Sequence, residues 1–280
     1  MATLCGSLYG LAQWRSLALM IAVDGLIRLL GIALTLSGDV VVLAWMVALP
    51  FPLTILLLWP LIRGGFVGRS ELDVGFSALT WNVARTVLAS ISTAVLVSGF
   101  PVLLGIMGHG VEPVLLGELI FTITLTRAPL IVGVMSLQSL LLVRFRDGSA
   151  ATARETLIVV AATITAGVLL LGGLGWGLGP PVLAWVSGHP TQIDGALVAV
   201  LIVSSGFVAA LSVSAAAVLA AGRHVIYVFG WLVAAIVTVG VMVAPIDFLP
   251  RVGAALIVGP LAGLAVHLGW WAVQALKGAR

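Results

Sequence analysis

An acid and a base lie four residues apart in the middle of an apolar stretch near the start of the chain. Asp24 and Arg28 interrupt residues 16–36, SLALMIAVDGLIRLLGIALTL. Residues four apart lie on one face of a helix, so these two side chains can form an ion pair. A charge at the centre of a bilayer costs about 2.5–3.5 kcal/mol on insertion scales, so the pair should face other helices or a water-filled cavity. It is either a functional site or a neutral contact that fixes helix packing.

Two more arginines, Arg85 and Arg127, lie inside apolar stretches. Arg127 precedes Pro129, which removes a backbone donor, so its guanidinium is expected to contact either a ligand or the freed carbonyl groups. Arg85 lies close enough to a membrane surface to be either an interface anchor or a substrate contact. Three arginines against the single deep carboxylate of Asp24 give a positively charged interior. Such an interior favours an anion, and guanidinium groups suit phosphate oxygens.

Two amide side chains accompany these arginines. Asn82 lies three residues before Arg85, and Gln138 lies eleven residues after Arg127, in each case close to the same helix face. Both are candidates to line the substrate cavity, although amides in membrane helices more often join helices by hydrogen bonds. We expect Glu118 to be solvated near the outer end of its helix and His267 to be a hydrogen-bonded packing residue.

Eight apolar stretches of membrane-spanning length must position these side chains. Hydrophobic residues make up 61% of the chain and charged residues only 8%, whereas a soluble domain is usually about 25% charged. Stretches of about 20 residues are typical of helices rather than barrel strands, so we predict an all-α polytopic bundle. The predicted spans are residues 16–36, 40–62, 78–107, 114–143, 156–176, 193–220, 225–245 and 252–275.

Proline and glycine predict where these spans are interrupted. Pro50, Pro52 and Pro60 should kink the second span, and residues 99–101, Gly-Phe-Pro, should break the third near its end. Residues 177–190 are expected to form a partly immersed outer loop, and residues 144–155 a basic loop. The polar segment 63–77 is the candidate boundary between two units, residues 1–70 and 71–280.

Basic residues outside the spans predict the orientation. With both termini in the cytoplasm, nine of them fall in inner segments and only Arg251 in an outer one, as the positive-inside rule requires. The nine inner residues are Arg15, Arg63, Arg69, Arg144, Arg146, Arg154, Arg223, Lys277 and Arg280. This distribution also accounts for the basic pI without a nucleic-acid partner. We therefore expect a multi-pass protein of the cell membrane.

The residues do not support disulfide, metal or enzymatic chemistry. The single cysteine, Cys5, allows no intrachain disulfide, and the four histidines form no metal-binding set. The sequence has no Ser-His-Asp arrangement, zinc-ligand spacing or glycine-rich phosphate loop. We expect a protein that is not an enzyme and that needs neither a metal nor a cofactor.

Three segments resemble polysaccharide-type flippases of the multidrug/oligosaccharidyl-lipid/polysaccharide exporter superfamily. SLYGLAQWRSLALMIAVDGLIRLLGIAL resembles the inner linker and fifth helix of that family, LGELIFTITLTRAPLIVGVMSLQSLLLVRF its eighth helix, and GRHVIYVFGWLVA the basic turn into its eleventh. The resemblance implies export of a lipid-linked, usually pyrophosphate-bearing sugar by alternating access between two six-helix lobes. Arg28, Arg127, Arg85, Asn82 and Gln138 would then contact the substrate, and Asp24 would orient Arg28 or carry a coupling proton.

The chain departs from this family in its number of spans. Eight spans correspond to the last two helices of the first lobe and a complete second lobe, so we expect a missing N-terminal half to be among the partners. Two alternatives stay open. One is a non-transporting scaffold that binds polysaccharide assembly proteins, and the other is a cation-coupled drug exporter of the same superfamily, which would need more interior acids than Asp24.

Overall fold

The structure is a computed structural model that describes residues 4, 8, 13–35, 38–63, 75–148 and 150–278. These residues form helices and short connections, with no strand among them. Eight segments of this described part are long and apolar enough to cross a membrane. The predicted all-α polytopic architecture is confirmed.

The chain divides into two compact units, Met1–Phe76 and Ser77–Arg280. The first unit contains α2 (Trp14–Thr35), α3 (Val40–Ala48) and α4 (Pro50–Ile62), and α2 packs against both α3 and α4. The predicted kink is confirmed at Leu49, because Pro50 starts α4 and has no N–H to continue the ladder of α3. Met20 of α2 packs with Leu58 and Ile62 of α4 in a buried cluster. The predicted boundary at residue 70 lies outside the described residues.

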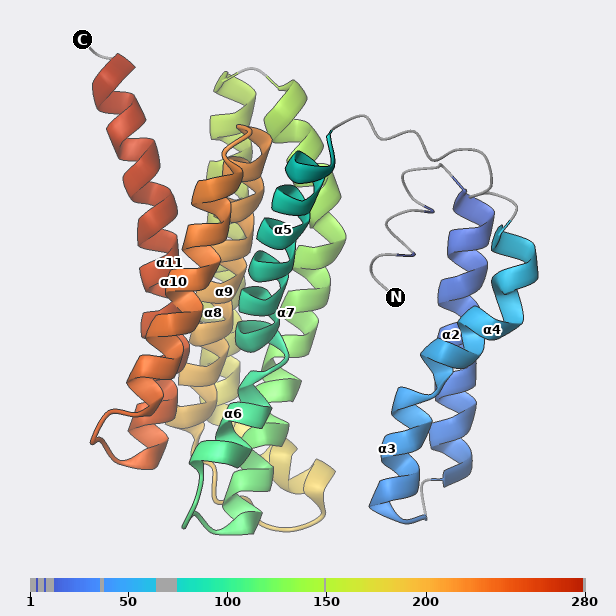
Figure 1. The fold of residues 1–280 in the computed structure, drawn as a ribbon. Coiled ribbons are helices and arrows are strands. Elements are labelled where there is room, and N and C mark those ends of the chain that lie inside the picture. The colour runs from blue at the N-terminus through green and yellow to red at the C-terminus, as the bar shows by residue number, and fades with distance from the viewer. Residues whose placement is uncertain are drawn as a thin grey trace. The chain divides into compact units, whose positions relative to one another are not determined.

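The second unit contains the remaining helices (Figure 1). They are α5 (Phe76–Val97), α6 (Phe100–Met107), α7 (Pro113–Asp147), α8 (Ala150–Ser187), α9 (Gly195–Ala220), α10 (His224–Met242) and α11 (Phe248–Gly278). The predicted break in the third span is confirmed, since α5 ends at Val97 and α6 begins at Phe100, with Pro101 in its first turn. Helix α9 is the most buried and contacts α7, α8, α10 and α11.

The antiparallel helices of this unit bring distant segments to common ends. The start of α5, the α7–α8 connection and the α9–α10 connection lie at one end of the unit, and the α6–α7, α8–α9 and α10–α11 connections lie at the other (Figure 1). The first end carries Arg144, Arg154 and Arg223, so we call it the inner end, in keeping with the predicted orientation.

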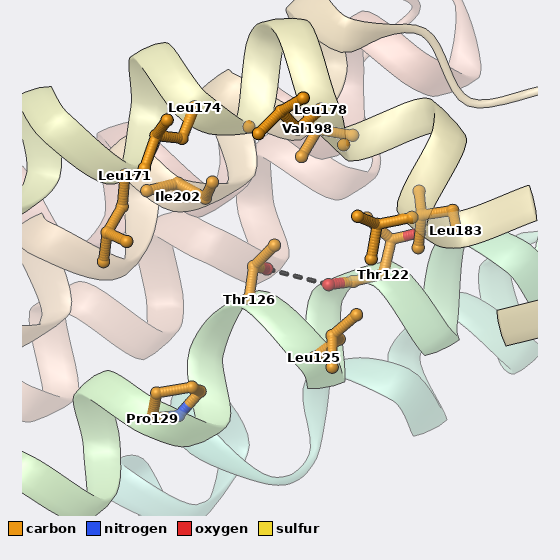
Figure 2. Close-up of a pocket in the computed structure, with 13 residues that line it drawn as sticks. Thr122, Leu125, Thr126, Pro129, Leu171, Leu174, Leu178, Leu183, Val198 and Ile202 are labelled. Atoms are coloured by element: carbon orange, nitrogen blue, oxygen red, sulfur yellow. Dashed lines mark hydrogen bonds between the residues drawn. The ribbon is translucent and has the colours of Figure 1, made fainter. Parts of the chain in front are cut away.

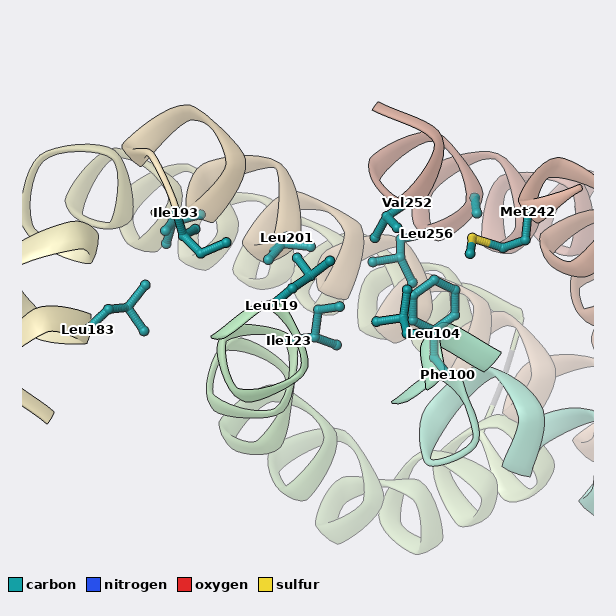
Figure 3. Packing of buried hydrophobic residues seen from close by; sticks show 12 residues of the cluster. Phe100, Leu104, Leu119, Ile123, Leu183, Ile193, Leu201, Met242, Val252 and Leu256 are labelled. Carbon is teal, nitrogen blue, oxygen red and sulfur yellow. The ribbon is translucent and has the colours of Figure 1, made fainter. Parts of the chain in front are cut away.

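A cluster of buried apolar side chains joins the outer half of this unit (Figure 3). Phe100 and Leu104 of α6 are fully buried against residues from α7 to α11. The short helix α6 therefore contributes to the core although it is separated from α5. The other members are Leu119, Ile123, Leu183, Ile193, Val198, Leu201, Met242, Val252, Ala255 and Leu256.

Two predicted loops are wrong. Residues 177–187 continue α8 as helix despite Pro180 and Pro181. In the predicted basic loop, Arg144 lies on the last turn of α7 and Arg154 on the second turn of α8. Packing explains the first difference. The carbonyl oxygen of Trp176, which Pro180 cannot pair with, lies against Gly195 at the start of α9, where any Cβ would overlap it. The neighbouring helix thus accommodates the interruption that proline makes.

Candidate functional site

The predicted ion pair of the first unit is present. Arg28 Nη2 donates to Asp24 Oδ2 at 3.2 Å, with the Asp24 side chain 11% exposed and that of Arg28 39% exposed. The pair is therefore asymmetric: the acid is packed among helices, and the base reaches the surface of the unit. Asp24 Oδ1 has no hydrogen-bond partner among the described residues.

A second buried oxygen lies in the same helix pair. Thr54 of α4 is 1% exposed, and its Oγ1 also has no partner among the described residues. Met20 and Leu58 share a cluster, and Asp24 and Thr54 each lie one helical turn from these residues, in the same direction along the antiparallel α2 and α4. The middle of the first unit thus holds two polar groups within an otherwise apolar contact.

Arg127 occupies the α5–α6 break of the second unit. Its side chain is buried, its Nη1 donates to the carbonyl oxygen of Leu96 at 2.7 Å, and its guanidinium carbon lies 5.7 Å from the ring centroid of Phe100. The end of α5 leaves carbonyl groups without an intrahelical donor, and a cation there also meets the negative end of the helix dipole. Arg127 therefore caps a broken helix, but the break belongs to α5 and not to its own Pro129.

This hydrogen bond uses only one of the donor nitrogens of the guanidinium group. Arg127 Nε and Nη2 are buried and have no hydrogen-bond partner among the described residues. The only ion pairs within 4.0 Å in the described part of the chain are Arg28–Asp24 and His189–Glu118, so Arg127 has no carboxylate partner there. A buried cation held by a single carbonyl group is a poor structural solution and can accept an anion.

Arg85 lines a different cavity, at the inner end of the second unit. We call this cavity of about 500 Å³ the inner pocket. It lies between α5, α9 and α10, and the guanidinium carbon of Arg85 lies 4.5 Å from the ring centroid of Trp81. The remaining lining residues are Ala89, Ser90, Leu219, His224, Tyr227 and Val228. Sequence reasoning missed Ser90, His224 and Tyr227, although the last two lie in the basic turn GRHVIYVF.

The six predicted site residues are divided between the two units. Asp24 and Arg28 belong to the first unit and the other four to the second. Within the second unit, Arg127 contacts Leu96, which follows Arg85 by about 16 Å of helix rise, so the two arginines occupy separate sites. Asn82 lies on α5 and Gln138 on α7, but their side chains are outside the described part of the structure.

An apolar cavity of about 420 Å³ opens between α7, α8 and α9 (Figure 2). Leucines and valines line it, and its two hydroxyl groups are satisfied within α7: Thr122 donates to the Glu118 carbonyl oxygen at 2.7 Å and Thr126 to that of Thr122 at 2.8 Å. Because the other lining residues that the structure describes are apolar, the cavity suits a hydrocarbon chain.

Glu118 differs from its prediction. Its side chain is only 9% exposed, and Oε2 accepts hydrogen bonds from Thr191 Oγ1 at 3.0 Å and from the backbone N–H of Gln192 at 2.8 Å. His189 Nδ1 lies 3.3 Å from Oε1. The carboxylate is therefore buried under the α8–α9 connection and holds it against α7, an arrangement that depends on residues more than 70 positions away in the sequence.

His267 is a hydrogen-bonded packing residue, as predicted. It is fully buried, and its Nδ1 lies 2.8 Å from Ser214 Oγ, which joins α11 to α9. Gly230 of α10 leaves room for the imidazole ring, since a Cβ there would overlap it. No group of three or more potential metal ligands is found in the residues that the structure describes.

Comparisons with known proteins give relatives but no function. No family model and no solved structure matches the chain. An uncharacterised protein of Mycobacterium tuberculosis is 30% identical over 284 residues, and an uncharacterised protein of Mycobacterium bovis is 29% identical over 272 residues. Each alignment covers 95% of this chain and 62% of the relative, so the chain spans less than two thirds of the length of these relatives.

Proposed function

We propose that this membrane protein exports a lipid-linked, anionic sugar by alternating access between helical units. The observation that carries the proposal is Arg127, a buried arginine with one hydrogen bond and with no carboxylate partner among the described residues. Guanidinium groups bind phosphate oxygens in a bidentate manner, and the unpartnered Nε and Nη2 are a pair of donors suited to that geometry.

The broken helix beside Arg127 supplies a means of exposing it. Helices that are interrupted within the membrane often form the substrate sites of transporters. The α5–α6 break rests on Gly99, where a Cβ would lie only 3.0 Å from Val95 Cα and 3.1 Å from the Ala94 carbonyl oxygen. A small movement of α6 would part Phe100 from the guanidinium and open the Nε and Nη2 donors of Arg127 to a ligand, while Leu96 of α5 keeps its hydrogen bond to Nη1.

The apolar cavity supports the lipid part of the proposal. A lipid-linked sugar presents an anionic head and a long hydrocarbon chain, and the second unit offers a cationic group and an apolar cavity on the same helix, α7. Thr126 lines this cavity, and Arg127 is the next residue, buried toward α5 and α6. Head and chain could therefore be held on two sides of one helix.

Depletion of the protein in its own cell tests the proposal. We expect the lipid-linked sugar to accumulate and to stay in the cytoplasmic leaflet, where an impermeant reagent that modifies the sugar from outside cannot reach it. Normal exposure of the sugar on the outer leaflet with slower polymer assembly would favour a scaffold instead. Increased retention of cationic drugs with no accumulated lipid-linked sugar would favour a drug exporter.

A further inference from the structure

The inner pocket contains a charged group whose purpose the fold does not explain. Arg85 is half-buried, and it has no carboxylate within 4.0 Å among the residues that the structure describes. Its contact with Trp81 at 4.5 Å places an aromatic face on the guanidinium and leaves the edge that carries the N–H donors available. A cation placed in this way in the wall of a cavity is suited to an anionic ligand.

The other described lining residues of the inner pocket add hydrogen-bond donors. Ser90 and Tyr227 carry hydroxyl groups and His224 carries an imidazole, whereas no aspartate or glutamate is found among the lining residues that the structure describes. His224 is also the first residue of α10, so the positive end of that helix dipole faces the same region. All of the polar groups thus favour an oxygen-rich anion, and phosphate is the biological anion that matches several donors at once.

The depth of the pocket indicates that the anion belongs to a lipid. His224 starts one candidate span, and Arg85 lies about 9 Å of helix rise inside another, Leu79–Val97. The pocket therefore extends from the membrane surface to the edge of the hydrocarbon region, where lipid headgroups lie. Ala89, Leu219 and Val228 line its apolar wall, against which the first carbons of a lipid could pack.

We propose that the inner pocket binds the phosphate group of a lipid headgroup, with Arg85 as the main contact and Tyr227, Ser90 and His224 as further donors. This inference rests on the proposed function, because it identifies the pocket as the position at which the phosphate of the lipid substrate first binds on the inner side. The Arg127 site is separate and follows later in the export path.

Binding to the purified protein in detergent tests the pocket without requiring transport. The probes are short-chain phosphatidic acid, short-chain phosphatidylcholine and inorganic pyrophosphate, each titrated while tryptophan fluorescence and the unfolding temperature are recorded. We expect phosphatidic acid to bind more tightly than the other two. Arg85→Gln should weaken its binding tenfold or more, Tyr227→Phe about threefold, and Arg85→Lys should retain part of the affinity.

Arg154→Gln is the matched control, because Arg154 is an exposed arginine at the same end of the unit but outside the pocket. Equal loss of binding in Arg154→Gln and Arg85→Gln would mean general attraction to a basic surface and would overturn the proposal. Equal binding of phosphatidic acid and phosphatidylcholine would also overturn it. Pyrophosphate binding as tightly as phosphatidic acid would overturn the lipid as the source of the phosphate.

Export in cells separates this inference from the proposed function. If Arg85→Gln loses both phosphatidic acid binding and export at normal abundance, the result supports the pocket and the export proposal. Normal export in a variant that no longer binds would overturn the pocket as the first binding position and leave the export proposal intact. Phosphatidic acid binding could depend on Arg85 while lipid-linked sugars still reach the outer leaflet after the protein is depleted. That result would overturn both the export proposal and the assigned substrate.

Discussion

Three arginines with the same sequence context, an apolar helix, have three different surroundings. Arg28 pairs with a buried carboxylate, Arg85 lines a cavity beside an aromatic ring, and Arg127 caps a broken neighbouring helix. A guanidinium group has five donors, and in each case the described residues use only part of this capacity. The difference between a structural and a ligand-binding arginine therefore depends on which neighbours satisfy the remaining donors.

The first prediction concerns Arg127. Arg127→Met should leave membrane abundance within about twofold of normal, because the lost hydrogen bond to Leu96 is offset by removal of a buried charge. Export should be abolished if Arg127 contacts the substrate. Arg127→Lys should restore export only in part, since an ammonium group cannot form a bidentate pair. A parallel fall of abundance and export in Arg127→Met, measured on the same membranes, would instead assign it a capping role alone.

The second prediction concerns the Asp24–Arg28 pair. Arg28→Gln alone leaves a buried carboxylate without its cation, so abundance should fall by an amount that reflects the cost of an unpaired charge. The double variant Asp24→Asn with Arg28→Gln should recover abundance, because neither residue is then charged. We expect its export to stay defective, in line with Arg28 as a substrate contact. Abundance and export are measured on the same cells. Full export by the double variant would show that the Asp24–Arg28 pair serves helix packing only.

At the scale of helices, close packing depends on a few glycines. Gly263 of α11 is buried against α10, where a Cβ would overlap the carbonyl oxygen of Gly230 and approach Ala234 Cβ at 2.8 Å. The atom that a Cβ would overlap is backbone, which cannot turn aside as a flexible side chain can. Glycine at this position therefore allows the close approach of α10 and α11.

The third prediction follows from this packing. Gly263→Ala should lower the stability of the folded protein by about 1–3 kcal/mol, as overpacking does in other cores. Gly269→Ala on the same helix is the control, because a Cβ there has no atom within 4 Å and alanine favours helix by up to about 1 kcal/mol. Unfolding midpoints in detergent compare the two variants. Equal unfolding midpoints for the two variants would show that α10 and α11 can move apart without loss of stability.

At the scale of the whole molecule, charge and topology agree within the second unit. The antiparallel helices place the α6–α7, α8–α9 and α10–α11 connections together at the end opposite Arg144, Arg154 and Arg223 (Figure 1). A membrane would hold the arginine-rich end on the cytoplasmic side. The orientation itself is a prediction that labelling can test.

The fourth prediction concerns this orientation. In a background without Cys5, single cysteines at His109, Pro190 and Ile246 should react with an impermeant thiol reagent added outside the cell, and a cysteine at Ala221 should react only after the membrane is opened. These positions are exposed and avoid Gly110, Gly188 and Gly222, whose positive φ angles disfavour a side chain. Labelling of Ala221→Cys from outside in intact cells would reverse the topology.

The sequence by itself determined the eight apolar helices and the breaks at Pro50 and at residues 99–101, because hydropathy and a missing backbone N–H act locally. It also placed Asp24 and Arg28 in contact, since four residues make one helical turn. Only the tertiary structure decided that Arg127 caps Leu96, that Glu118 is buried under the α8–α9 connection and that α8 continues through Pro181. Each of these depends on which helix packs beside another, and eight helices of similar hydropathy carry little local information about their neighbours.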